Sequence, residues 1–217
     1  MIENSNISKT FEQIIKTRRT VRSFTNEAPK KEDINEIAAS ALYAPYAGAT
    51  GIPLHEIRRV FILAHNSRAK KEANELLISQ IKNNSAKMNN MLAVFPFLKK
   101  KMKPFSERLK SISRYGIPSL KEATYYIIVA EKKGFPPIEK QSIAHALQNM
   151  WLTATNKGLG FHLLSATGIM SKNEQFLNLL GLTKGDYAID GCVIGNPVKY
   201  PDIVKEFDLN KCVKWIE

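Results

Sequence analysis

The stretch "ALQNMWLTATNKGLGFHLLSATG", residues 146–168, carries a helix pattern, a glycine stop and a strand pattern in direct succession. Apolar residues recur at helical spacing over 143–154, which predicts a long amphipathic helix. Gly158-Leu159-Gly160 is typical of a helix C-terminus, and the FHLL that follows is typical of a short strand. A helix followed this closely by a strand predicts a domain that mixes both kinds of element.

Three further helices are predicted from caps and helix breakers. A short first helix with Ser8 as its N-cap runs into an arginine cluster, and a second helix follows Pro29 and stops near Pro45. Ser171 with Glu174 is a capping-box pattern, which predicts a helix that opens there.

Strands are predicted at 57–64, 123–130 and 187–197, where short apolar runs are rich in β-branched and aromatic residues. The tail alternates like another strand up to Trp215. The stretch 66–114 has an irregular helical pattern. Because helices and strands interleave without a linker, we expect one α+β or α/β domain over residues 1–217, with a basic helical excursion at about 66–114.

Composition and missing motifs exclude several classes of protein. Apolar residues make up 44% of the 217, which is ordinary for a globular chain. The N-terminus lacks the pattern of a secretory signal, and the longest apolar run, YYIIVA, is too short to span a bilayer. Cys192 and Cys212 have no metal-binding spacing, so we expect no metal and a reduced, cytoplasmic setting.

No phosphate-binding loop, dinucleotide-binding glycine motif, nucleophile elbow or HExxH motif occurs, and the four histidines are scattered. If the protein is an enzyme, an organic cofactor should carry its chemistry, with no side chain predicted as catalytic.

The formal net charge of +12 is unevenly distributed. Residues 66–114 hold 12 Lys and Arg against 3 Asp and Glu, whereas the remainder holds 20 against 17. The basicity therefore belongs mostly to one segment. This distribution gives little support to nucleic acid as a partner, and we expect no membrane association.

The stretch "KTRRTVRSF", residues 16–24, gathers three of the eight arginines of the chain at Arg18, Arg19 and Arg22. One interpretation is a solvated charged turn. The other is a site for a dianionic phosphate, because guanidinium groups bind such an anion with paired hydrogen bonds.

Four stretches in order resemble the FMN-dependent nitroreductase superfamily: "IIKTRRTVRSF", "APYAGATGIP", "ALQNMWLTATNKGLGFHLLSATG", and "LLGLTKGDYAIDGCVIGNP" with a terminal "VKWIE". Their order and spacing make the resemblance more specific than any one of them. It implies an α+β fold, with a central, mostly antiparallel sheet flanked by helices. It also implies a homodimer that exchanges terminal segments, and FMN as the cofactor.

The resemblance assigns roles to the arginine cluster. By it, Arg18, Arg19 and Thr20 hold the FMN phosphate, and Arg22 lies near the N1 and O2 edge of the isoalloxazine. Lys205 is expected to add one cation to the phosphate site. A cation near N1 stabilises the anionic reduced flavin, which favours hydride acceptance.

Two loops complete the expected site. Pro45, Tyr46, Ala47 and Gly48 correspond to the family loop that packs on the flavin from the partner subunit, although Tyr46 replaces the commoner serine. A second set lies at the reactive edge, where a backbone amide reaches N5 or O4: Ala166, Thr167 and Gly168.

The resemblance implies an FMN-dependent NAD(P)H oxidoreductase that passes electrons by a ping-pong hydride mechanism to nitroaromatics, quinones or another small acceptor. Three alternatives stay open: a specialised flavoenzyme of the same fold such as an azoline-type oxidase, a flavin-binding protein without turnover, and a basic nucleic-acid-binding module without flavin. The basic segment is interpreted as an amphipathic cover above the flavin, a solvated insertion, or a surface that attracts an acidic partner.

Overall fold

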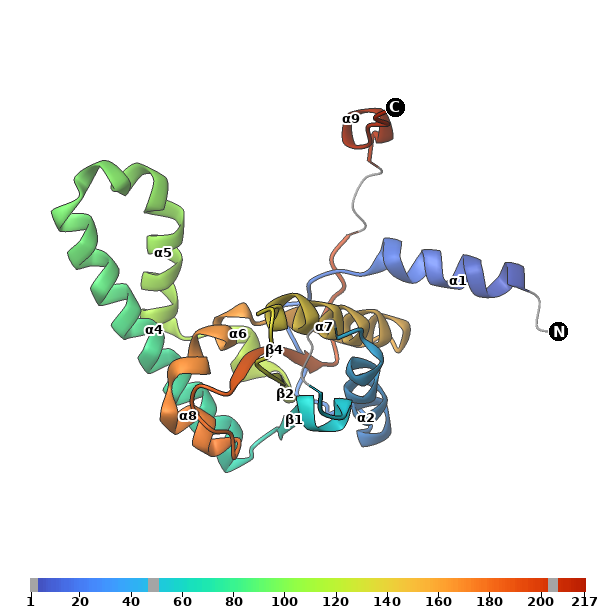
Figure 1. Ribbon diagram of the computed structural model, residues 1–217, viewed down its shortest axis with the longest axis horizontal. Coiled ribbons are helices and arrows are strands. Elements are labelled where there is room, and N and C mark those ends of the chain that lie inside the picture. Colours follow the sequence, from blue (N-terminus) through green and yellow to red (C-terminus); the bar gives the residue numbers. More distant parts are fainter. Residues whose placement is uncertain (1–3, 47–50, 203–206) are drawn as a thin grey trace.

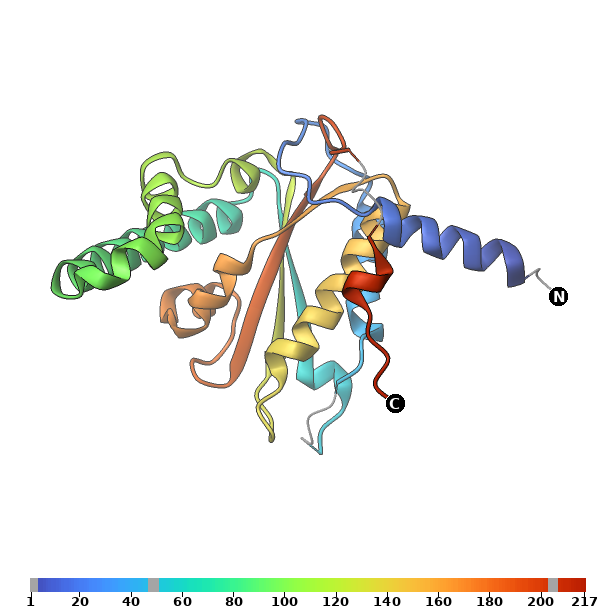
Figure 2. The ribbon, with the colours of Figure 1, turned by 90° about the horizontal axis from the view of Figure 1, so that it is seen from above.

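The computed structural model describes residues 4–46, 51–202 and 207–217, and its centre is an antiparallel sheet in the order β1-β2-β4-β3 (Figures 1 and 2). The strands are β1 (Arg58–Ala64), β2 (Tyr125–Lys132), β3 (Gly160–Leu163) and β4 (Tyr187–Gly195). β2 pairs along its whole length with β4 and along most of it with β1, which makes it a central strand. The predicted α+β class with an antiparallel sheet is confirmed.

Helices cover both faces of this sheet. The α-helices are α1 (Asn4–Thr17), α2 (Lys31–Ser40), α3 (Leu54–Ile57), α4 (Arg68–Val94), α5 (Lys99–Tyr115), α6 (Pro118–Glu122), α7 (Glu139–Asn156), α8 (Glu174–Leu179) and α9 (Leu209–Cys212). The 3₁₀-helices are η1 (Ala41–Tyr43), η2 (Pro96–Leu98) and η3 (Ser165–Lys172). α2 and α7 pack on one face, and α4, α8 and η3 pack on the other (Figure 1).

Burial of β2 on both faces of the sheet explains why its sequence is a continuous apolar run. Tyr126 and Ile128 join the core cluster on the α4 and α8 side, whereas Ile127 and Val129 join the cluster under α2 and α7. Successive side chains of a strand point to opposite faces, so a strand covered on both sides must be apolar at every position.

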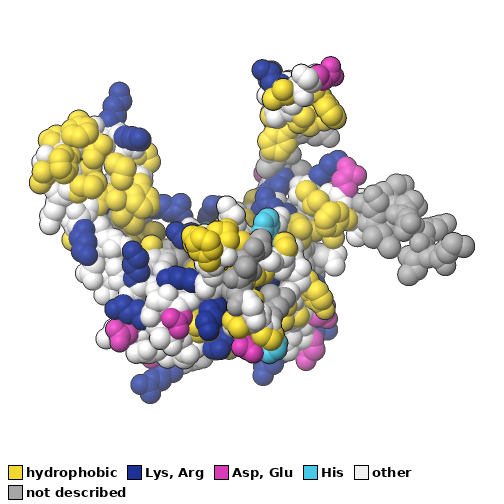
Figure 3. All heavy atoms as spheres, viewed as in Figure 1, with side chains coloured by type: hydrophobic (Ala, Val, Ile, Leu, Met, Phe, Trp, Pro, Cys, Tyr) yellow, Lys and Arg dark blue, Asp and Glu magenta, His cyan; other side chains and the backbone are white. Residues whose placement is uncertain are grey.

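Two parts of the chain project from this body. α4 and α5 pack together as a pair that extends from one side, and α1 extends from the other (Figures 1 and 2). Apolar side chains gather at the tip of the α4–α5 pair, beside Lys and Arg side chains (Figure 3). Phe97 at this tip is 77% exposed, and Trp215 in the C-terminal tail is 90% exposed. No helix within the described ranges is long and apolar enough to cross a bilayer.

Three local predictions are wrong. Ser8 lies inside α1 and is therefore not its N-cap. Asn173 caps α8 by accepting a hydrogen bond from Phe176 N, whereas Ser171 belongs to η3 and donates to Gly168 O. The tail forms the short helix α9, and the described residues after α9 are not in a strand. No strand of the described residues pairs with them.

Candidate functional site

The arginine segment lies along β3. Val21 N donates to Phe161 O at 3.0 Å, and Thr20 forms a parallel bridge with the same residue. Gly160 permits this approach, because a Cβ there would meet Val21 Cγ1 at 2.8 Å. The glycine that marks the end of α7 in the sequence therefore also makes room for the segment that carries the arginines.

The arginine cluster has no carboxylate partner among the described residues. The Arg18 guanidinium lies 4.1 Å from the ring centre of Trp151, and burial together with the neighbouring Arg19 lowers the pKa of Arg18. Arg19 Nε donates to Asp202 O at 2.9 Å, but its Nη2 is buried without a partner in the described ranges. No carboxylate of the described residues pairs with Arg18, Arg19 or Arg22. Such a cluster suits a dianionic ligand.

His162 on β3 is buried beside these charges. Its Nδ1 lies 2.7 Å from Ser119 Oγ, and burial, reinforced by Arg22 and Arg108, lowers the pKa of the imidazole to about 4. The ring is therefore neutral near pH 7.

η3, which follows β3, carries the residues predicted at the reactive edge of the flavin: Ala166, Thr167 and Gly168. Thr167 Oγ1 donates to Leu164 O at 2.7 Å and lies 2.7 Å from the hydroxyl of Tyr126, and Thr167 N also donates to Leu164 O. Leu164 N donates to Gly191 O on β4 at 2.8 Å, which fixes the start of this turn. Both donors of Thr167 are thus used inside the protein, whereas Ala166 lines a cavity.

Pro45 and Tyr46 lie elsewhere in the chain, at the end of the sheet opposite the arginine cluster. The buried Arg58 guanidinium holds this turn by donating to Ala44 O at 2.8 Å and Pro45 O at 3.3 Å. One subunit therefore does not bring these two predicted site residues to the arginines. Ala47, Gly48 and Lys205 lie outside the described residues.

Arg58 is itself held by a buried network. Its Nε donates to Glu131 Oε1 at 2.5 Å, and its Nη2 donates to Ser142 Oγ at 2.8 Å. Burial raises the pKa of the Glu131 carboxyl, and hydrogen bonds from Ser142 and Arg58 oppose that rise.

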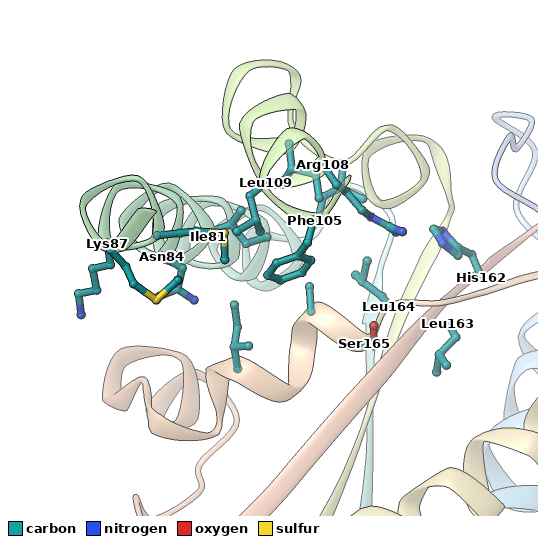
Figure 4. A pocket seen from close by; sticks show the side chains of 16 residues that line it. Ile81, Asn84, Lys87, Phe105, Arg108, Leu109, His162, Leu163, Leu164 and Ser165 are labelled. Atoms are coloured by element: carbon teal, nitrogen blue, oxygen red, sulfur yellow. The ribbon is translucent and has the colours of Figure 1, made fainter. Parts of the chain in front are cut away.

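A cavity of about 800 Å³ lies between the α4–α5 pair and the β3–η3 connection (Figure 4). Its wall is mainly apolar and includes Met88, Phe105 and Ile169. The cations that line it are Lys87 and Arg108, and Figure 4 shows the Arg108 guanidinium pointing toward His162. Among the described residues, no cluster of His, Cys, Asp and Glu is suited to a metal ion.

Sequence and structure comparisons agree with this architecture. Residues 15–195 match the Nitroreductase family, so the chain belongs to that family, and the resemblance found in the sequence is confirmed. Among proteins with curated functions, none matches the chain.

Solved structures share the fold at low sequence identity. One is a nitroreductase with bound FMN from Bacteroides fragilis, at 18% identity and a TM-score of 0.69 over 95% of this chain and 98% of that chain. Another is a nitroreductase with bound FMN from Desulfitobacterium hafniense, at 20% identity and a TM-score of 0.67 over 96% and 98%. An iodotyrosine deiodinase bound to FMN and 3-iodo-L-tyrosine matches at 20% identity and a TM-score of 0.62 over 91% and 95%.

The sequence patterns did not indicate several groups that shape these sites. They include Arg58 with Glu131, Trp151, His162, and Arg108 of the basic segment. Each of these residues contacts a residue that is distant in the chain, as His162 contacts Ser119, so no local sequence motif predicts its role.

Proposed function

We propose that the protein is an FMN-dependent NAD(P)H oxidoreductase that transfers electrons to nitroaromatics, quinones or another small acceptor by a ping-pong mechanism. Membership of the Nitroreductase family and the FMN named for several structural neighbours support this function. The observation that carries it is the arginine cluster beside β3, which has no carboxylate partner in the part of the chain that the structure describes. When bound, FMN would supply hydride acceptance and electron release.

The arginine cluster fits the phosphate of FMN. Arg19 Nη2 is a buried donor without a partner among the described residues, and Arg18 is held in place by Trp151. We assign phosphate binding to Arg18, Arg19 and Thr20, with Lys205 as a further cation. A phosphate accepts several charge-assisted hydrogen bonds at once, and it would remove the repulsion between the two adjacent arginines.

Arg22 and the start of η3 fit the ring end of the cofactor. Arg22 lowers the pKa of His162 on β3, and Ala166 is the second residue of η3, which follows β3. Amides in the first turn of a helix have no partner within that helix, so Ala166 N is a suitable donor to the N5 or O4 edge. Thr167 would support this turn, because its own donors are engaged, and Gly168 continues it.

A homodimer would complete the site. Pro45 and Tyr46 lie away from the arginines of their own subunit, which suits a loop that serves the flavin site of a partner. The exposed apolar side chains of α1 and the tail, such as Phe11 and Trp215, suit exchange with a second copy.

The first experiment is an absorption spectrum of the purified protein, followed by release and identification of any chromophore. We expect bound FMN, and Arg18→Ala and Arg22→Ala should each weaken FMN binding by about tenfold or more, because each removes a charge-assisted contact. Fluorescence titration with FMN measures this loss.

Lys30→Ala is the control, since Lys30 is an exposed cation before α2 and no role in the site is assigned to it. A protein that neither carries FMN nor takes it up would contradict the proposed function. Bound FMN that NADH and NADPH both fail to reduce would instead indicate a flavin protein without this turnover.

A further inference from the structure

We propose that the cavity between the α4–α5 pair and the β3–η3 connection binds an apolar aromatic molecule that carries one carboxylate, and that Arg108 holds the carboxylate. The role of this cavity as the acceptor site of an oxidoreductase rests on the function proposed above. Binding of the carboxylate in the cavity can be tested whether or not the protein has that activity.

The charge of the cavity wall favours an anion. Lys87 and Arg108 line it, and the described residues of its wall include no Asp or Glu. No described residue forms a hydrogen bond or ion pair with the Arg108 guanidinium, and the neighbouring Glu107 on α5 pairs with Lys103 instead. An unpaired guanidinium at an apolar wall binds a carboxylate with two parallel hydrogen bonds.

The position of Arg108 directs the ligand toward β3. Its side chain leaves α5 and points toward His162, while Lys87 lies at the other end of the cavity (Figure 4). His162 is neutral near pH 7, so it can contact a ligand without adding a charge of its own. Arg22 also lowers the pKa of His162 but does not line the cavity, so Arg108 is the cation at this end of the cavity wall among the described residues.

The apolar part of the wall suits a ring. Met88, Met91 and Phe105 supply adaptable and aromatic surface from α4 and α5, and Ile169 supplies the opposite side from η3. The volume of about 800 Å³ is within the usual range for small-molecule sites. An uncharged apolar ligand would use this surface but leave the guanidinium unpaired.

An adjoining hollow of about 780 Å³ shares Lys87 and Ser165 with the cavity and adds Lys140, Lys172 and Asp190. Cations outnumber the one carboxylate in this hollow as well. Arg108 does not line the hollow, so the Arg108 variants separate binding in the cavity from binding there.

The test uses 4-nitrobenzoate and its uncharged analogue 4-nitrobenzamide as probes. Isothermal titration calorimetry on the protein, with FMN added, measures the dissociation constant of each probe. We expect wild type to bind the acid about tenfold or more tightly than the amide, and Arg108→Met to abolish that preference while it leaves amide binding unchanged. Arg108→Lys should retain part of the preference, because it keeps the charge but loses the planar fork.

Arg114→Met is the matched control. It removes the same charge from the same helix, but Arg114 lies over the ring of Tyr115 and does not line the cavity. It should keep the preference for the acid. Thermal unfolding of each variant shows whether it is folded, and Arg108→Gln provides a second neutral substitution should Arg108→Met fail to fold.

Equal affinities of wild type for the acid and the amide would overturn the proposal, as would a preference that survives in Arg108→Met and Arg108→Gln. The same titrations without FMN separate this outcome from failure of the proposed function. A protein that takes up no FMN, yet shows the Arg108-dependent preference, would keep the anion site and lose the oxidoreductase function.

Discussion

At the scale of single residues, the partly buried Asp190 and the buried His162 have opposite effects on how stability depends on pH. Burial raises the pKa of Asp190 to about 6, against a hydrogen bond from Gly191 N, so the folded state binds a proton that the unfolded state releases. Stability from Asp190 therefore falls as pH rises from about 4 to 6. His162, with its pKa lowered to about 4, makes stability rise over nearly the same range.

Asp190→Asn should separate the two effects. We expect it to leave the free energy of unfolding unchanged near pH 4 and to raise it by about 1–2 kcal/mol at pH 7, because it removes a partly buried charge. Urea unfolding at several pH values measures this difference. Asp186→Asn is the control at an exposed carboxylate before β4, and as a surface substitution it should change the free energy of unfolding by less than about 0.5 kcal/mol. If Asp190→Asn changes the free energy of unfolding by the same amount at pH 4 and pH 7, the pH dependence does not come from Asp190.

Arg58 shows how one buried side chain organises residues that are far apart in sequence. Its guanidinium joins Glu131 on β2, Ser142 on α7 and the carbonyls of Ala41 and Ala44. Removing one partner of a buried ion pair leaves the other charge without compensation.

Arg58→Met should therefore lower the free energy of unfolding by about 3–5 kcal/mol. The double variant Arg58→Met/Glu131→Gln should recover part of this loss, since no buried charge remains. A double-mutant cycle by chemical denaturation gives the coupling, and additive losses would show that the pair is not coupled.

At the scale of elements, the contact between the arginine segment and β3 links the fold to the candidate site. β3 has only four residues, yet Phe161 receives Val21 N on one edge while β4 pairs with the other. Gly160 lies at the start of this strand, where the side chains of Val21 and Phe24 fill the space that a Cβ would need.

Gly160→Ala should displace the arginine segment. We expect a loss of about 1–3 kcal/mol in the free energy of unfolding from overpacking, together with weaker FMN binding. Gly168→Ala is the control for stability alone, because a Cβ there would meet Ile189 O at an ordinary 3.5 Å. Unchanged stability and FMN affinity in Gly160→Ala would show that the segment can move aside without cost.

At the scale of the whole molecule, the exposed apolar surface of the two termini supports the proposed homodimer. Phe11 and Ile15 on α1 are about half exposed, and Trp215 and Ile216 in the tail are almost fully exposed. Stable homodimers commonly bury such surface, and exchanged segments are one way to do so.

Deletion of residues 207–217 should weaken the dimer. We expect wild type to sediment at twice the mass of the chain, and the truncated protein to shift toward the monomer and bind FMN less tightly. Analytical ultracentrifugation over a range of concentrations measures the shift. Lys214→Ala in the full chain, an exposed cation in the same tail, should remain dimeric. A truncated protein that stays dimeric would remove the tail from the interface.

The sequence by itself determined the order of the elements and the family. The apolar run of β2, the helical spacing of α7 and the glycines after it depend on local physics, so they were predictable. The ends of the helices were less predictable. The N-cap of α8 is Asn173 rather than Ser171, because Ser171 belongs to η3 and donates to Gly168 O.

Only the tertiary structure decided which charges meet. The sequence placed three arginines together, but it did not show that Trp151 supports Arg18 or that Arg108, 86 positions after Arg22, acts on the same histidine. It also did not show that Pro45 is held by Arg58 at the far end of the sheet. Pairing of side chains depends on strand order and on the depth of burial, and both arise only when distant segments pack together.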